Sequence, residues 1–271
     1  MPEERIASVG VLRITSESAV ETEDVLAVEE PLEIRVAWRV QDEQREKPIS
    51  VTMRTPGDDF DLAAGFLFTE ALIGSGAEIE SIRQWGSPNV VRVSLADGAT
   101  IDASKLDRHF YTTSSCGVCG KTSIDAVRVI RSRPPQPPSR ISRALVQRLP
   151  ELLAEHQPAF RVTGGLHGAA VLRPSGELLR IREDIGRHNA VDKAIGSLVR
   201  EEPASLTGGI LMVSSRASFE IVQKAIVAGI GTLAAVGAPS TLAVDAAREF
   251  GLTLLGFVRD GRFNVYAGGV E

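Results

Sequence analysis

The pattern of apolar and polar residues gives the two halves of the chain different characters. In the first half, β-branched residues alternate with polar ones, which is typical of strands in a half-exposed sheet. The alternation predicts strands at Val9–Thr15, Leu32–Trp38, Ile49–Arg54 and Asn89–Leu95. Apolar residues at helical spacing predict a helix near Asp59–Leu72 that buries Leu62, Phe66 and Leu67. This half is therefore expected to be an α+β structure.

The second half alternates short apolar runs with helical periodicity. The runs at Ile210–Val213 and Thr232–Val236 are typical of strands that are covered on both faces. Helices are predicted from Ile141 to Leu153, over the segment containing Val191 and Leu198, over Phe219–Ala228 and around Leu242–Phe250. Further short apolar runs lie at Ala159–Val162, Ala169–Leu172, Leu178–Ile181 and Leu252–Val258. The alternation predicts an α/β layered structure.

A proline-rich segment separates these two patterns. Arg131–Arg140 reads RSRPPQPPSR, and proline cannot donate a backbone hydrogen bond to a helix or sheet. The segment is expected to be an extended linker. We therefore predict an amino-terminal domain of residues 1–138 and a carboxy-terminal domain of residues 139–271.

Composition narrows the functional classes. The 271 residues are 43% hydrophobic and 24% charged, which are ordinary globular values, and the net charge is −5. That charge argues against broad binding to nucleic acid. Ala225–Val244 carries no charged residue, but three glycines and a proline interrupt it, so a membrane span is not expected. With no signal peptide and only two cysteines, the protein is expected to be cytoplasmic.

The two cysteines, Cys116 and Cys119, form a C-x-x-C pair within Tyr111–Asp125. Thr122–Asp125 matches a capping box, which predicts a helix that begins directly after the pair. The helix dipole and Lys121 would both favour thiolate over thiol. An anionic sulfur on an exposed loop is what persulfide formation needs.

Three other interpretations of the pair are weaker. A zinc site needs about four ligands, but the chain has no second C-x-x-C and its four histidines lack finger-like spacing. A thioredoxin-like dithiol would follow the first strand of a βαβ unit, and this pair does not. Inert buried cysteines do not suit so polar a segment. We favour sulfur chemistry and expect no tightly bound structural metal.

Three turns of the second half predict an anion site. Glu183–Asn189, Ser214–Ser218 and Gly237–Thr241 each follow a predicted strand and open a helix. Ligands of open α/β sheets bind at such ends. Donors suited to phosphate there are Arg187, His188, Ser214, Ser215, Arg216, Ser240 and Thr241. Helix capping explains the serines and threonines but not the three cationic residues together. Asp260-Gly261 predicts a hairpin turn, which either only stabilises the fold or places Arg259 and Arg262 at an anion cleft.

Six motifs, taken together and in order, resemble a known family. They are SSCGVCGK, TGGLHGAA, EDIGRHNAVDK, SSRASFEIVQKA, GAPST and GFVRDGR. From Ser50 onward the chain resembles the formate dehydrogenase accessory sulfurtransferase (FdhD/NarQ) family. The resemblance implies that a cysteine desulfurase loads a persulfide onto Cys116, with Cys119 as assisting or resolving partner. The sulfur would then pass to a molybdenum or tungsten bis(molybdopterin guanine dinucleotide) cofactor, which enters formate dehydrogenase.

The resemblance also has consequences for fold and binding. It implies homodimers and a three-layer carboxy-terminal domain similar to cytidine deaminases. It places cofactor binding on Phe257, Val258, Arg259, Asp260, Gly261 and Arg262, to which the predicted cleft adds Arg187, His188 and Ser214. A deaminase-like hydrolase is excluded because RHNAVD and SRASFE stand where zinc ligands would be required. Two alternatives remain open: a non-catalytic cofactor chaperone and a thiol-disulfide oxidoreductase.

Overall fold

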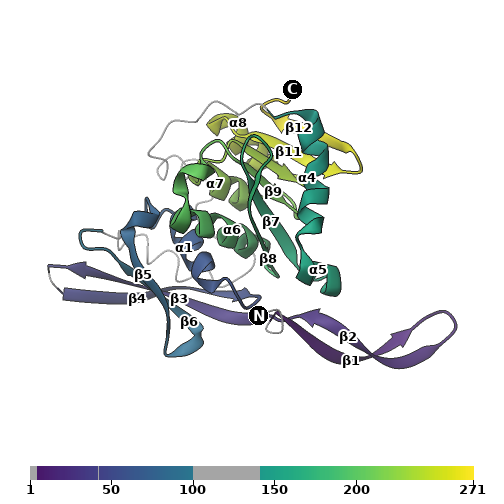
Figure 1. Ribbon diagram of the computed structural model, residues 1–271, viewed down its shortest axis with the longest axis horizontal. Coiled ribbons are helices and arrows are strands. Elements are labelled where there is room, and N and C mark those ends of the chain that lie inside the picture. The colour runs from purple at the N-terminus through teal and green to yellow at the C-terminus, as the bar shows by residue number, and fades with distance from the viewer. Residues whose placement is uncertain (1–4, 42, 100–140) are drawn as a thin grey trace.

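The computed structural model describes residues 5–41, 43–99 and 141–271, whose strands form three separate sheets (Figure 1). The predicted mixture of helices and strands is confirmed. Three predicted features lie outside the described residues: the segment Tyr111–Asp125 with its C-x-x-C pair, the helix expected after that pair, and the proline-rich linker Arg131–Arg140. Within the described ranges, no helix is both long enough and apolar enough to cross a membrane.

The first half contains a hairpin and a four-stranded sheet. Strands β1 (Ile6–Ile14) and β2 (Ala19–Ala27) form a separate two-stranded sheet, and Figure 1 shows this hairpin reaching out from the body. The sheet has the order β4-β3-β6-β5. Its strands are β3 (Glu30–Val40), β4 (Glu43–Arg54), β5 (Ile79–Trp85) and β6 (Ser87–Leu95). A short 3-10 helix, η2 (Gly76–Glu78), precedes β5.

One face of this sheet is covered by helix α1 (Asp59–Thr69). Leu32, Ile34 and Val36 of β3 are fully buried against the helix residues Leu62 and Leu67. The four predicted strands and the helix are confirmed. Strands β2 and β5 were not predicted, and the helix ends at Thr69 rather than Leu72 because the backbone N–H of Leu72 turns back to the carbonyl of Leu67.

The second half is built on a six-stranded sheet of order β12-β11-β10-β9-β7-β8. Its strands are β7 (His167–Leu172), β8 (Leu178–Asp184), β9 (Ile210–Val213), β10 (Thr232–Ala235), β11 (Thr253–Arg259) and β12 (Arg262–Ala267). Strands β9, β10 and β11 are parallel. Strand β8 runs the same way, because β7 is antiparallel to both β8 and β9. Four strands therefore end at one edge of the sheet.

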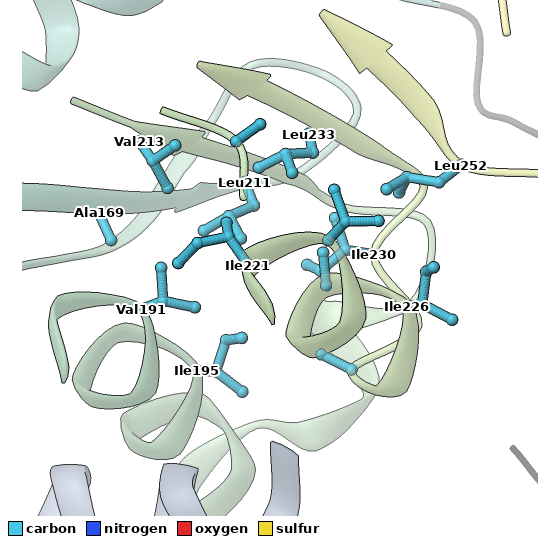
Figure 2. Packing of buried hydrophobic residues seen from close by; sticks show 14 of the residues in the cluster. Ala169, Val191, Ile195, Leu211, Val213, Ile221, Ile226, Ile230, Leu233 and Leu252 are labelled. Atoms are coloured by element: carbon cyan, nitrogen blue, oxygen red, sulfur yellow. The ribbon is translucent and has the colours of Figure 1, made fainter. Parts of the chain in front are cut away.

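Helices cover both faces of this sheet. They are α4 (Arg143–Glu155), α5 (Pro158–Thr163), α6 (Arg187–Glu201), α7 (Phe219–Val227), α8 (Thr241–Phe250) and the 3-10 helix η3 (Pro203–Leu206). Figure 2 shows the core on one face, where Val191 and Ile195 of α6 and Ile221 of α7 lie opposite Leu211 and Val213 of β9. Helix α4 packs on the other face. The apolar run at Ala159–Val162 belongs to α5, since Pro158 opens that helix.

The two halves meet where α1 crosses α6. A Cβ atom added at Gly65 would lie 1.9 Å from the carbonyl oxygen of Asp192, and one added at Gly196 would lie 2.0 Å from that of Asp61. The helices are thus in backbone contact, and only glycine at both positions permits it. The layers follow in order as α4, the six-stranded sheet, α6 with α7 and α8, α1, and the four-stranded sheet (Figure 1).

Replacing Gly65 by alanine is expected to lower the free energy of unfolding by about 2 kcal/mol, because overpacking a tight contact costs roughly 1–3 kcal/mol. Urea unfolding followed by circular dichroism measures the change. Gly10→Ala is the matched control, because an added Cβ at Gly10 meets nothing within 4 Å. Equal stability of the two variants would contradict the close crossing.

Candidate functional site

The candidate site lies at the edge where the parallel strands end. The three predicted turn segments occupy this edge, after β8, β9 and β10. Two of them are joined: Gly237 N–H donates to the carbonyl of Ser215, and Ala217 N–H to the carbonyl of Ala238. Strand β7 adds its first residues, since Gly168 N–H donates to Ser214 Oγ at 2.9 Å. The loops thus form one continuous rim.

Strand β11 reaches this rim through a strained bulge. Its register with β12 shifts between Gly256 and Arg259, and Phe257 has a φ of 53°. A positive φ is unfavourable for a bulky residue and is found where surrounding structure enforces it, often at functional sites. Here the N–H of Phe257 donates to the carbonyl of Gly237, 3.1 Å away. The bulge changes the direction of the strand directly before Arg259.

A cationic cavity of about 330 Å³ opens between these loops. Its walls are His167, Arg187, Ser214, Ser215, Arg216, Val236, Gly237 and Arg259. This lining carries three guanidinium groups and no carboxylate. In addition, Arg187 Nε is shielded from solvent and has no hydrogen-bond partner among the described residues. Since buried donors are nearly always satisfied, this orphan donor indicates a site for an anion.

A second cavity, of about 260 Å³, adjoins the first. It is lined by Phe257, Arg259, Arg262 and Asn264. Arg259 belongs to both linings, and its guanidinium lies 5.7 Å from the centre of the Phe257 ring. The two cavities together suit an elongated ligand with several anionic groups better than a single phosphate.

A buried ion pair anchors the loop that carries Arg187. Asp184 and Lys193 are both fully buried, with 2.7 Å between Oδ2 and Nζ. Asp184 also accepts from Gly186 N–H at 2.8 Å and from Thr55 N–H at 3.1 Å. Lys193 donates to the Thr55 carbonyl at 2.7 Å. The loop between β4 and α1 therefore fixes the loop between β8 and α6, and so positions Arg187.

Glu183 and Asp184, at the start of the predicted turn Glu183–Asn189, accept hydrogen bonds from backbone N–H groups and so cap local structure. Glu183 accepts from the N–H groups of Ala159 and Phe160 at the start of α5. Asp192 instead lies deep in the helical layer, where it accepts from Lys224 Nζ at 3.0 Å and from Thr69 Oγ1 at 2.7 Å. Burial raises the pKa of Asp192 to about 6, although Lys224 opposes the shift.

The two histidines near the cavity are held neutral. Burial, assisted by the positive charge of Arg187, lowers the pKa of His167 below its ordinary value of 6.5. Burial lowers the pKa of His188 to about 4, with further contributions from Lys224 and Arg187. His167 lines the first cavity, whereas His188 faces Glu220, with 3.9 Å between Nε2 and the carboxylate.

The structure brings some predicted site residues together and separates others. Arg187, Ser214 and Arg259 line the first cavity, and Phe257, Arg259 and Arg262 line the second. Val258 is fully buried and packs in the core beneath α4, so its side chain is turned away from the cavities. Asp260 and Gly261 form the exposed turn between β11 and β12. Cys116 and Cys119 lie outside the described residues.

Asn264 is a lining residue that the sequence did not single out. It lies two positions after Arg262 in β12, and alternate residues of a strand share a face. That period-two spacing was available in the sequence. His167 is a second lining residue that the sequence left undecided. In the motif TGGLHGAA it could equally be a structural histidine, and the pairing of β7 with the Ser214 loop brings it to the cavity.

Fold and site together define a class of protein: a mixed α/β protein with an arginine-lined cleft at the carboxyl edge of its parallel strands. The FdhD/NarQ family model matches residues 27–270. A protein of Streptomyces coelicolor called "Sulfur carrier protein FdhD" is 47% identical over 95% of this chain and 92% of its own length. One of the same name from Sulfolobus acidocaldarius is 41% identical over 97% and 96%. The chain belongs to the FdhD/NarQ family.

A solved structure supports the fold. The crystal structure of a proposed formate dehydrogenase accessory protein from Desulfotalea psychrophila superposes with a TM-score of 0.74. It covers 97% of both chains at 22% sequence identity. At that identity the likeness concerns the fold alone.

Proposed function

We propose that this chain is a sulfur carrier for formate dehydrogenase maturation. The observation that carries the proposal is its membership of the FdhD/NarQ family, with relatives called sulfur carriers that align over nearly their whole length. Cys116 is the proposed persulfide residue, because it is the first thiol of the C-x-x-C pair in the motif SSCGVCGK. The proposed sulfur donor is a cysteine desulfurase, which makes the chain a sulfurtransferase.

The proposed chemistry consists of two exchanges at sulfur. In the first, the Cys116 thiolate attacks the outer sulfur of the persulfide on the desulfurase. A new S–S bond forms, and the desulfurase cysteine leaves as a thiolate, so nothing is oxidised or reduced overall. In the second, the Cys119 thiolate attacks the inner sulfur of Cys116. A disulfide forms, and the outer sulfur leaves as sulfide with the electron pair of the broken bond.

The proposed substrate that accepts this sulfide is bis(molybdopterin guanine dinucleotide) bound to molybdenum or tungsten. Each of its two guanine dinucleotide arms carries a negatively charged pyrophosphate group. Two adjoining cavities that share Arg259, together with the orphan Arg187 Nε, suit such a ligand. Within the described residues, Arg187, Arg216 and Arg259 would hold phosphates in the first cavity, while Arg262 and Asn264 would contact groups in the second.

The proposal also covers the domain division, the fold of the second domain, the partners and the location of the protein. Separate cores in residues 32–95 and 141–267 support a division into domains of residues 1–138 and 139–271. The six-stranded sheet with helices on both faces supports a cytidine deaminase-like second domain. Formate dehydrogenase and a cysteine desulfurase are the proposed partners, and the cytoplasm is the proposed location.

Peptide mass spectrometry after incubation with a cysteine desulfurase and cysteine tests this function. The expected result is a gain of one sulfur atom that maps to Cys116 and disappears on reduction. If no sulfur is gained while the nucleotide cofactor still binds, the carrier function is wrong and a cofactor chaperone takes its place.

Binding of guanosine diphosphate is expected to strengthen as the pH falls below about 6.5. Free His167 carries less positive charge there than an ordinary histidine, because burial, assisted by Arg187, lowers its pKa. A bound pyrophosphate favours the charged imidazolium and raises that pKa, so the complex takes up a proton. Calorimetric titrations at pH 7.5 and 5.5 measure the change. The phosphate also titrates in this range, so His167→Gln is the control, and an unchanged pH dependence in that variant would exclude His167 as the proton acceptor.

A further inference from the structure

The three guanidinium groups of the first cavity have no carboxylate partners among the described residues. Arg187, Arg216 and Arg259 all line the cavity, and none of them forms an ion pair with a described residue. By contrast, Arg182 on the neighbouring strand β8 pairs with Asp61 at 2.8 Å. Arg187 Nε is also shielded from solvent without a hydrogen-bond partner in the described ranges. The cavity therefore holds positive charge that only a bound anion would neutralise.

The acidic side chains of the surrounding elements are engaged elsewhere. Asp184 binds Lys193, with 2.7 Å between Oδ2 and Nζ. Glu183 accepts hydrogen bonds from the backbone at the start of α5, and Glu220 faces His188. In the part of the chain that the structure describes, no group of three or more histidine, cysteine, aspartate or glutamate side chains is placed to hold a metal ion. A magnesium ion in this cavity would therefore have guanidinium groups as neighbours and no carboxylate of the described lining as a ligand.

Magnesium decides which phosphate compounds suit such a cavity. Free nucleotides carry Mg²⁺ on their phosphate oxygens, and those are the oxygens that guanidinium groups would bind. Guanosine diphosphate (GDP) has about three negative charges at neutral pH, because its terminal phosphate is almost fully ionised, and its magnesium complex has about one. A pyrophosphate that is esterified at both ends has about two negative charges and lacks that terminal phosphate, so it holds Mg²⁺ more weakly. In the presence of Mg²⁺, the esterified pyrophosphate is therefore the better ligand for three arginines.

We propose that the first cavity binds pyrophosphate without a divalent cation, and that it thereby selects a dinucleotide over the magnesium complexes of free nucleotides. The selection rests on the proposed function, because the nucleotide cofactor supplies the esterified pyrophosphate. Ser214 adds a neutral donor: its Oγ already accepts the N–H of Gly168 at 2.9 Å, so its hydroxyl proton can be directed to a phosphate oxygen. Guanidinium groups and a hydroxyl then take the place that Mg²⁺ and its water shell have in other nucleotide sites.

Calorimetric titration of the full chain at pH 7.5, with and without about 5 mM MgCl₂, tests this selection. GDP is the free nucleotide, and GDP-mannose is the probe whose pyrophosphate is esterified at both ends. Mg²⁺ is expected to lower the apparent affinity for GDP about 5-fold, because it removes the uncomplexed nucleotide by mass action. The affinity for GDP-mannose is expected to stay within about 2-fold. Sodium chloride at the same ionic strength is the control, since any salt screens charge.

Two arginine variants locate the binding in the first cavity. Arg216→Gln is expected to weaken GDP-mannose binding about 10-fold, because a charge-assisted hydrogen bond is lost. Arg143→Gln, at the start of α4, is the matched control, because Arg143 is exposed and lines neither cavity. Its loss of affinity is expected to stay below about 2-fold.

Four results would each overturn the selection: stronger GDP binding with Mg²⁺, an equal loss for GDP and GDP-mannose, no binding of GDP-mannose, or equal effects of the Arg216 and Arg143 variants. None of them would remove the carrier function, which is measured separately as sulfur gained on Cys116. Conversely, the expected Mg²⁺ effects without that sulfur gain would leave the selection standing and remove sulfur transfer.

Discussion

Replacement of Cys116 by alanine is expected to abolish sulfur loading completely while guanosine diphosphate binding stays within about 2-fold of the original affinity. The proposal assigns the attack on the desulfurase persulfide to the Cys116 thiolate and only the release step to the Cys119 thiolate, so no transfer is expected without Cys116. The two cavities proposed to bind the nucleotide are lined by residues between 167 and 264, far along the chain from the thiol pair. Mass spectrometry reads the loading, and calorimetry reads the binding.

Cys119→Ala separates this mechanism from its rivals. A carrier with a resolving thiol should still load one sulfur onto Cys116 in this variant but fail to release it as sulfide. A thiol-disulfide oxidoreductase should depend equally on both cysteines. A cofactor chaperone should support active formate dehydrogenase even with Cys116→Ala, and that result would remove sulfur transfer from the proposed function.

Apart from β1, which has no buried residue, the strands and helices that periodicity predicted are buried on one face or completely. The run at Ile210–Val213 could be recognised as a strand because every side chain in it is buried. Strand β2, with the sequence AVETEDVLA, could not, because β1 is its sole partner among the described strands and no residue in it is buried. Strand β5 was missed for the same reason. A strand without a buried face is under no constraint to alternate apolar and polar residues, so periodicity does not have to reveal it.

The site was predictable in outline because loops between strands and helices converge where parallel strands end. That argument placed Arg187 and Ser214 there, whereas Arg259 came from the predicted hairpin turn and the family resemblance. The structure brings all three to one cavity. The positive φ of Phe257 was not predictable, because nothing local enforces it: a hydrogen bond to Gly237 from a different loop does. The Asp184–Lys193 ion pair was not predictable either. Thr55 forms hydrogen bonds with both side chains, but it lies 138 positions before Lys193 in the chain.

That buried pair carries the largest expected effect on stability. Lys193→Met is expected to lower the free energy of unfolding by about 3–5 kcal/mol, because removing one member of a buried ion pair leaves the other charge uncompensated. Both side chains are fully shielded from solvent, so water cannot replace the lost ammonium. The variant also frees the Thr55 carbonyl, which lies in the loop that joins β4 to α1. Urea unfolding at pH 7 measures the loss.

Arg173→Met serves as the control for that loss. Arg173 pairs with Glu177 at 3.0 Å and with Glu202 at 2.8 Å, but all three side chains are exposed to solvent. Exposed ion pairs contribute roughly 0–1 kcal/mol, so this variant should unfold close to the original midpoint. If Lys193→Met is no less stable than Arg173→Met, Asp184 does not need its ammonium partner. The hydrogen bonds from Gly186 and Thr55 would then suffice to hold the Arg187 loop in place.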